Sequence, residues 1–300
     1  MYEIKLGIIG LDTSHVTAFT KLLHHQDENY HIAGARVTLA YPGGSPHLSL
    51  SSSRLKGFTE EMRQTYGVPI TDSIQKVAEE CDAILIESVD GGTHLEQLKE
   101  VVSYQKPIFV DKPFALNTEE AQEMLRLCRE FQTPIMSTSA LRYAEALTRL
   151  LEKHSHRRIV GADCFGPMEV LEEIPGLFWY GIHTVEMLYT IMGRGVDTIQ
   201  AVKLDEHDSI TAVWEDGRVG TIRGNRVGNH QFGAVIHYED GTEFVVIRPD
   251  DKPFYASLLE EIIGFFRDGI TRVPLEETVE IIRFIEAANE SRETREVVRL

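Results

Sequence analysis

The sequence predicts an α/β protein, with a doubly wound parallel sheet first and an α+β domain with a mainly antiparallel sheet second. From residue 4 to about 140, short apolar runs alternate with segments of helical periodicity, which is typical of a parallel sheet with right-handed crossovers. After about residue 140 this alternation stops, and Asp-Gly pairs separate apolar runs, as in antiparallel hairpins. We therefore expect one domain over residues 1–140 and another over residues 141–300.

The first half is expected to form strands and helices in turn. The predicted strands are short, continuous and apolar, as strands buried on both faces should be: residues 4–9, 36–40, 83–86, 107–110 and 134–138. The predicted helices are residues 16–24, 59–66, 72–80 and 94–103, and one that begins at Asn117. Asp72 and Asn117 have the chemistry of N-caps. The polar stretch of residues 41–53, rich in Pro, Gly and Ser, is expected to be a loop.

In the second half, Asp216-Gly217 and Asp240-Gly241 each join two predicted strands: residues 210–214 to 219–223, and 232–238 to 243–247. Helices are expected over residues 141–152, 257–266 and 275–289. An antiparallel sheet with helices on one side has an open face that needs cover. We expect a second copy of the chain to cover it, giving a homodimer or homotetramer through the C-terminal sheet.

Composition excludes several classes of partner. The chain has 300 residues, a net charge of −17 and a pI near 5.1, so it repels nucleic acid and anionic membranes. The N-terminal residues lack the basic region and cleavage site of a signal peptide. The three cysteines, Cys81, Cys128 and Cys164, are far apart and in apolar contexts. They are expected to be reduced core residues of a cytoplasmic protein, with no disulfide and no zinc site.

The most informative stretch is residues 108–113, in which three apolar residues are followed by Asp111, Lys112 and Pro113. Since proline cannot continue a central strand, Lys112 is expected at the carboxyl end of a buried strand. Open α/β sheets bind their ligands at that edge. A lysine there can polarise a hydroxyl or carbonyl oxygen, although a solvated residue at a strand end is the simpler interpretation.

Six motifs, in this order, resemble the glucose–fructose oxidoreductase / inositol dehydrogenase (Gfo/Idh/MocA) family nearly from end to end. They are Gly7-Ile8-Ile9-Gly10, Glu87 to His94, Asp111-Lys112-Pro113, Arg142-Tyr143, Gly181 to Glu186, and Ala287 to Ser291. Each motif is weak alone, and their order and spacing carry the resemblance.

This resemblance implies that residues 1–140 form a Rossmann-type dinucleotide-binding domain, and residues 141–300 a domain for substrate binding and oligomerisation. Hydride would pass between NAD or NADP and a sugar, polyol or related alcohol. Lys112 and His183 would be catalytic, with His183 as general acid/base. The resemblance also implies cofactor contacts by Gly10, Asp12, Thr13, Ser14, His15, Asp111 and Lys112, and substrate contacts by His94, Arg142, Trp179 and Glu186. No metal ligand is assigned.

The first turn departs from the family's Gly-x-Gly-x-x-Gly/Ala pattern, which falls on Gly10, Asp12 and His15. The second and third glycines normally allow close approach of the diphosphate and of the helix. A carboxylate about 4 Å from a phosphate is repelled by about 1 kcal/mol even in water. Either Asp12 caps the following helix in a degenerate turn, or the turn is an adapted phosphate site with His15 facing the phosphate.

Two further departures concern the ribose and the catalytic helix. After the second predicted strand, residues 40–45 offer neither the usual acid for ribose hydroxyls nor an adjacent arginine. Trp179 stands where the family usually has an aspartate, four residues before His183. Glu186 follows His183 by three residues on the same helix face, and could orient the imidazole instead.

Two other functions remain open beside the oxidoreductase. A family member without hydride chemistry would bind a small metabolite as a sensor or accessory subunit. A metal-assisted lyase or isomerase would use zinc or manganese, with ligands among Asp12, His15, His94, His183 and Glu186. No compact ligand motif in the sequence supports the metal enzyme.

Overall fold

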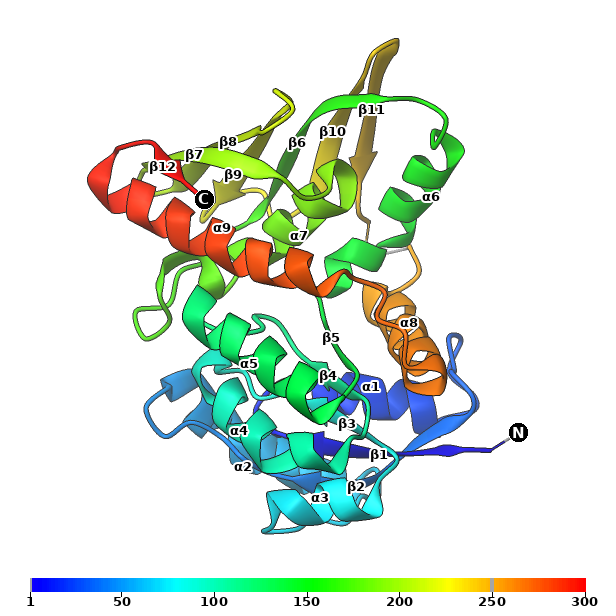
Figure 1. Ribbon diagram of the computed structural model, residues 1–300. Helices are drawn as coiled ribbons and strands as arrows, with labels where there is room; N and C mark the ends of the chain where they lie inside the picture. Colours follow the sequence, from blue (N-terminus) through cyan, green and yellow to red (C-terminus); the bar gives the residue numbers. More distant parts are fainter. Residues whose placement is uncertain (1, 249–250) are drawn as a thin grey trace. The chain divides into compact units, whose positions relative to one another are not determined.

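The computed structural model describes residues 2–248 and 251–300 (Figure 1). Its internal contacts divide the chain into two compact units, Met1–Thr138 with Tyr255–Leu275, and Ser139–Phe254 with Glu276–Leu300. The roles assigned to residues 1–140 and 141–300 stay predictions. In the part of the chain that the structure describes, no helix is long and apolar enough to cross a membrane.

The first unit contains a five-stranded sheet of order β2-β1-β3-β4-β5 in which every pair is parallel, so the predicted doubly wound sheet is confirmed. Its strands are β1 (Ile4–Ile9), β2 (Ala35–Tyr41), β3 (Ala83–Ile86), β4 (Ile108–Val110) and β5 (Ile135–Ser137). The three strands β3 to β5 are buried along their whole length, as their apolar runs predict. The chain goes to opposite sides of β1 for β2 and for β3, so a topological switch point lies between β1 and β3.

The helices of the first unit are α1 (His15–His24), α2 (Ser49–Gln64), α3 (Ile74–Glu80), α4 (His94–Val101), α5 (Thr118–Phe131) and α8 (Phe254–Asp268). Short 3-10 turns are η1 (Gly91–Thr93) and η2 (Val102–Tyr104). Asn117 caps α5 as predicted, since its side chain accepts from the Glu120 N–H. Asp72 does not cap α3, because Ser73 is the N-cap and accepts from the Lys76 N–H.

The prediction of a loop through residues 51–53 is wrong, because α2 already begins at Ser49. Serine usually weakens a helix by competing for backbone hydrogen bonds. Here Ser51 is fully buried, and its hydroxyl accepts from the Ser45 N–H and donates to Asp12. These tertiary hydrogen bonds satisfy the hydroxyl inside the fold and compensate for the weak local preference.

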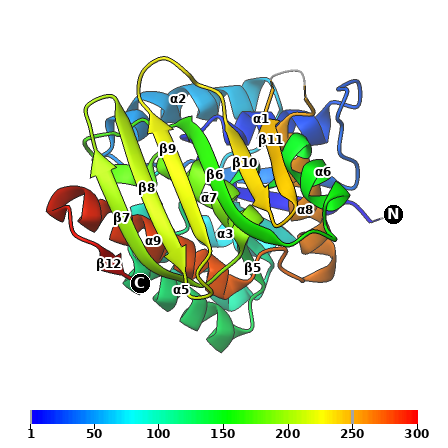
Figure 2. The same cartoon turned by 90° about the horizontal axis from the view of Figure 1, so that it is seen from above.

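The second unit contains a seven-stranded sheet of order β11-β10-β6-β9-β8-β7-β12, antiparallel except for the β6–β9 pair (Figure 2). Its strands are β6 (Ile159–Pro167), β7 (Val196–Lys203), β8 (His207–Trp214), β9 (Val219–Asn225), β10 (Gly233–Tyr238), β11 (Gly241–Val246) and β12 (Val298–Arg299). Both predicted hairpins are confirmed, as β8–β9 and β10–β11. The sequence did not predict β6, β7 or β12. In β6, glycines and a proline interrupt the apolar pattern.

One face of this sheet packs on helices and the other is open. The unit's helical segments are η3 (Ala140–Tyr143), α6 (Glu145–Lys153), η4 (Gly176–Phe178), α7 (Gly181–Met192) and α9 (Leu275–Thr294). The expected helix over residues 141–152 is thus divided at Ala144, whose backbone is not helical. In β8, buried side chains alternate with more exposed ones, and Val202 on β7, Val219 on β9 and Phe244 on β11 are exposed. All three cysteines are free and buried, as predicted.

Candidate functional site

The candidate residues of the first unit lie at the carboxyl edge of the parallel sheet. The turn of residues 10–15 follows β1, Glu87 follows β3, and Asp111 and Lys112 follow β4. Since these are neighbouring parallel strands, their following residues meet at one edge, at the switch point between β1 and β3. Lys112 is buried there, so its interpretation as a solvated residue is wrong.

The turn after β1 is held tightly by its backbone. Gly10 has φ +94°, and a Cβ on it would lie 2.3 Å from the Ser88 hydroxyl oxygen, so only glycine fits. The N–H groups of Gly10 and Leu11 donate to the carbonyls of Tyr41 and Pro42, at 3.0 and 2.7 Å. The first glycine of the dinucleotide pattern therefore retains its function as a tight turn.

Asp12 takes part in the fold and does not cap α1. Its side chain is fully buried; Oδ1 accepts from the Val89 N–H at 3.0 Å, and Oδ2 accepts from the Ser51 hydroxyl at 2.6 Å. The N-cap of α1 is Ser14, whose side chain makes no capping hydrogen bond. The proposed capping role of Asp12 is therefore wrong. This carboxylate ties the turn to the loop after β3 and to α2.

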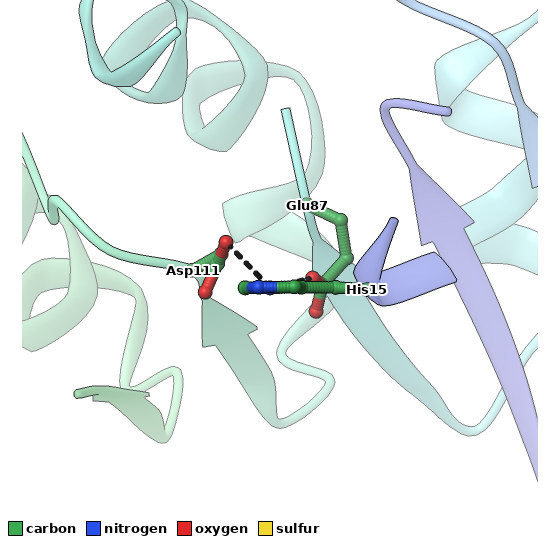
Figure 3. A group of neighbouring side chains, drawn as sticks. All are labelled: His15, Glu87 and Asp111. Carbon is green, nitrogen blue, oxygen red and sulfur yellow. Dashed lines mark ion pairs between the residues drawn. The ribbon is translucent and has the colours of Figure 1, made fainter. Parts of the chain in front are cut away.

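His15 lies against two carboxylates at the switch point (Figure 3). Its Nδ1 is 2.9 Å from Asp111 Oδ2 and 3.6 Å from Glu87 Oε2, and all three side chains are buried. Burial disfavours the imidazolium, but the Asp111 carboxylate outweighs it and raises the pKa of His15 to about 9. Burial and the charge of Asp111 raise the pKa of Glu87 to about 7. The pKa of Asp111 falls to about 2, because His15 outweighs the effect of burial.

The remaining first-unit candidates lie around this edge. Thr13 is buried and its Oγ1 accepts from the His15 N–H at 3.5 Å, whereas Ser14 is exposed. The ring nitrogens of the fully buried His94 lie 3.2 Å from the Phe114 carbonyl and 2.8 Å from the Ser88 carbonyl. His94 thus joins the loops that follow β3 and β4. Its role toward substrate stays a prediction.

A groove of about 710 Å³ lies beside the end of β2. Its lining combines one acid, Asp72, with two cations, Arg63 and Lys76, and with residues of the loop that follows β2. The sequence places neither an acid nor an arginine directly after β2. The fold supplies both from α2 and from the segment around α3, which local spacing cannot show.

In the second unit, Ser139 links His183 to Glu186. Its hydroxyl lies 2.7 Å from His183 Nδ1, and its N–H donates to Glu186 Oε1 at 3.1 Å. The rings of Tyr180 and Phe232 meet the imidazole edge-on. No sequence motif singles out Ser139, because only the fold brings it to α7.

Arg142 joins two buried carboxylates. Its Nε donates to Glu186 Oε2 at 2.8 Å and its Nη2 donates to Glu277 Oε1 at 2.7 Å. The two carboxylates outweigh the burial of the guanidinium and raise the pKa of Arg142. Half-buried Trp179 lies beside Tyr180, with ring centroids 6.0 Å apart. The substrate contacts assigned to Arg142, Trp179 and Glu186 stay predictions.

Comparisons with known proteins agree with this fold. Residues 4–139 match the profile of the GFO_IDH_MocA family, described as an oxidoreductase family with an NAD-binding Rossmann fold. No curated protein matches the chain.

Three of the solved structures that are similar to the whole chain are described as dehydrogenases. Scyllo-inositol dehydrogenase from Lactobacillus casei, with bound NAD(H) and scyllo-inositol, is 14% identical, with 99% of each chain covered and a TM-score of 0.78. A probable dehydrogenase from Thermotoga maritima is 20% identical, covering 99% of this chain and 98% of its own, with a TM-score of 0.77. The WlbA dehydrogenase from Bordetella pertussis, in complex with NADH and UDP-GlcNAcA, is 16% identical, with 99% of each chain covered and a TM-score of 0.77. At these identities the similarity establishes the fold.

Proposed function

Because residues 4–139 match the Gfo/Idh/MocA oxidoreductase family, described with an NAD-binding Rossmann fold, we propose that this protein transfers a hydride between a nicotinamide cofactor and an alcohol. The proposed substrate is a sugar, a polyol or a related alcohol. The family match over the whole parallel sheet is the observation that carries this proposal. Inositol and a nucleotide sugar in the structures from Lactobacillus casei and Bordetella pertussis support the substrate class.

Two features of the first unit fit a dinucleotide. Ser14 makes no side-chain capping bond at the start of α1, and Thr13 Oγ1 accepts from the His15 N–H only at 3.5 Å, so this helix start suits a phosphate. Asp12 does not oppose this, since both of its oxygens already accept hydrogen bonds inside the fold. The groove beside β2 suits the adenosine end, where Asp72 favours the free ribose hydroxyls of NAD, and Arg63 with Lys76 favours the ribose phosphate of NADP. The bound cofactor would supply the hydride chemistry.

The proposed catalytic residues are Lys112, which is buried in the first unit, and His183, which contacts Ser139 in the second unit. Lys112 would polarise the substrate oxygen, because a buried ammonium acts more strongly than a solvated one. His183 would act as general acid/base toward the substrate. The contact between Ser139 and Nδ1 would hold the imidazole in one orientation.

A second function is favoured by the altered turn. Asp12 and His15 fill the positions of the second and third glycines with buried side chains, and both are engaged inside the fold. A family member of this kind would bind a small metabolite as a sensor or accessory subunit, without hydride transfer. Calorimetric titration with sugars and polyols in the absence of cofactor tests this function.

We also propose that the protein works in the cytoplasm as a homodimer or homotetramer. The exposed apolar side chains of Val202, Val219 and Phe244 in the second sheet support an interface between copies of the chain. Light scattering coupled to size exclusion measures the mass. A Phe244→Lys substitution is expected to shift the mass toward that of one chain.

Cofactor binding is tested by exciting tryptophan while NADH or NADPH is added. The chain has two tryptophans, half-buried Trp179 and fully buried Trp214. Saturable energy transfer at micromolar cofactor supports cofactor binding, and its loss in Trp179→Phe but not in Trp214→Phe would identify Trp179 as the energy donor. Absence of transfer up to millimolar cofactor, from folded protein, refutes the oxidoreductase proposal and directs the search to ligands that bind without cofactor.

A further inference from the structure

The three side chains at the switch point contain an unsatisfied carboxylate. The side chain of Glu87 is 0% exposed, and neither of its oxygens has a hydrogen-bond partner among the residues that the structure describes. A buried carboxylate without a donor is strongly unfavourable, so such a group marks a missing proton or a missing cation.

His15 cannot satisfy both acids. Nδ1 carries at most one proton, and Asp111 Oδ2 lies nearer to it, at 2.9 Å, than Glu87 Oε2, at 3.6 Å. The raised pKa of Glu87 agrees with this, because a buried carboxylate without a donor or a nearby cation holds its proton more tightly. Lys112 also acts electrostatically on His15, Glu87 and Asp111, so its ammonium would compete with any bound cation.

The spacing of the three groups suits a single ion. One ligand atom from each residue lies within 4.8 Å of the others. Ligands at about 2.1 Å from a metal ion are separated by about 3.0–3.4 Å in octahedral or tetrahedral geometry. The distances of 2.9 and 3.6 Å from His15 Nδ1 lie on either side of this range. The two carboxylates would then need to approach each other on the side of His15 Nδ1 to share one ion, starting from ligand atoms that lie within 4.8 Å.

We propose that His15, Glu87 and Asp111 bind one divalent cation of the zinc or manganese type. An imidazole nitrogen with two carboxylate oxygens is a donor set that suits these ions, and the two carboxylates balance the charge. Three protein ligands leave a coordination position for water or for an oxygen of a small molecule. The rings of Tyr255 and Phe19 pack against His15, with centroids 4.8 and 5.7 Å away, and fix its orientation.

This site goes beyond the proposed oxidoreductase activity, because that activity requires no metal. No metal ligand was assigned from the sequence, and the candidates named for the alternative metal enzyme also included Asp12, His94, His183 and Glu186. Asp12 and His94 are engaged with backbone groups, and His183 and Glu186 belong to the second unit. Only His15 is common to both sets.

The test measures metal binding to the full-length protein without cofactor or alcohol. Chelator-treated protein is titrated with Zn²⁺ and with Mn²⁺ in a calorimeter, and its metal content is measured by mass spectrometry after dialysis. We expect about one ion per chain, and binding weakened about tenfold or more by Glu87→Gln or Asp111→Asn. Lys112→Met is expected to tighten binding by removing the competing ammonium. Circular dichroism confirms that each variant is folded.

A matched control addresses adventitious binding. His237 and Asp163 form a similar pair, with Nε2 to Oδ2 at 2.7 Å, but both side chains are about half-exposed. Asp163→Asn should leave the affinity unchanged. Folded wild-type protein that binds neither ion, wild-type affinity in both Glu87→Gln and Asp111→Asn, or loss of binding in Asp163→Asn alone would each overturn the proposal. None of these results bears on cofactor binding, so the two proposals fail separately.

Discussion

Arg142 provides the sharpest test of how the second unit is held together. Replacing it by methionine keeps much of the side-chain volume and removes the charge. We expect this change to destabilise the second unit by about 4 kcal/mol, since breaking a buried ion pair costs about 3–5 kcal/mol. The result also tells whether Arg142 stabilises the fold, because loss of a substrate contact alone would leave the free energy of unfolding unchanged.

The expected loss in free energy of unfolding is worked from two hydrogen bonds that the guanidinium makes to carboxylates. Its side chain is 11% exposed, and it donates to Glu186 at 2.8 Å and to Glu277 at 2.7 Å. Each hydrogen bond to a charged group contributes about 1.5–3 kcal/mol, so the two together contribute about 3–6 kcal/mol. Burial already raises the pKa of Glu277 against the opposing effect of Arg142. Without Arg142, the Glu277 carboxylate takes up a proton more readily and is no longer a buried charge. We therefore expect the loss in free energy of unfolding to lie near the middle of the range of about 3–6 kcal/mol.

The assay is urea unfolding followed by tryptophan emission. Trp179 and Trp214 both lie in the second unit, so their emission reports the unfolding of that unit. Arg149→Met is the matched control, because Arg149 pairs with Glu145 at 2.7 Å but is 72% exposed. Arg149→Met should lower the free energy of unfolding by less than about 1 kcal/mol. A loss in Arg142→Met that is no larger than in the control would refute the structural role and leave the guanidinium for substrate binding.

Three predictions concern the first unit. Asp12→Ala leaves a buried N–H without its acceptor and should lower the free energy of unfolding by about 2–4 kcal/mol, measured by urea unfolding with circular dichroism; the Asn variant should lose less. Burial and the nearby Arg36 lower the pKa of His24 to about 4, so the folded state favours the neutral ring. The folded state therefore has its full stability above pH 6.5, where His24 is neutral in both states, and loses stability as the pH falls toward 4. For the half-exposed ring this loss amounts to about 1–2 kcal/mol after solvent screening, and unfolding curves of His24→Gln against wild type should show it over that range. Gly10→Ala should lower the free energy of unfolding by about 2–4 kcal/mol, because Gly10 has a positive φ and an added Cβ would lie only 2.3 Å from a hydroxyl oxygen. Gly57→Ala on α2 is the control: its Cβ would enter open space, so this change should stabilise the protein slightly.

The sequence by itself determined the strands of the first sheet and the two hairpins of the second. Continuous apolar runs bounded by turn residues predict buried parallel strands, because such strands need apolar side chains on both faces. Asp-Gly pairs predict tight hairpins, because their backbone readily adopts the required turn. Asn117 predicts a helix start for a similarly local reason, since its side chain satisfies an N–H three residues later. All of these signals act over a few neighbouring residues.

Only the tertiary structure decided which polar side chains meet. His15, Glu87 and Asp111 follow three different strands, and they come together only because β1, β3 and β4 are neighbours in the sheet. The order of strands is a property of the whole fold, and no local pattern records it. The same reason explains why the partnership of Asp12 with Ser51 had no signal in the sequence. Periodicity and turn chemistry determine where elements begin and end, whereas the packing of the elements determines what their polar side chains can bind.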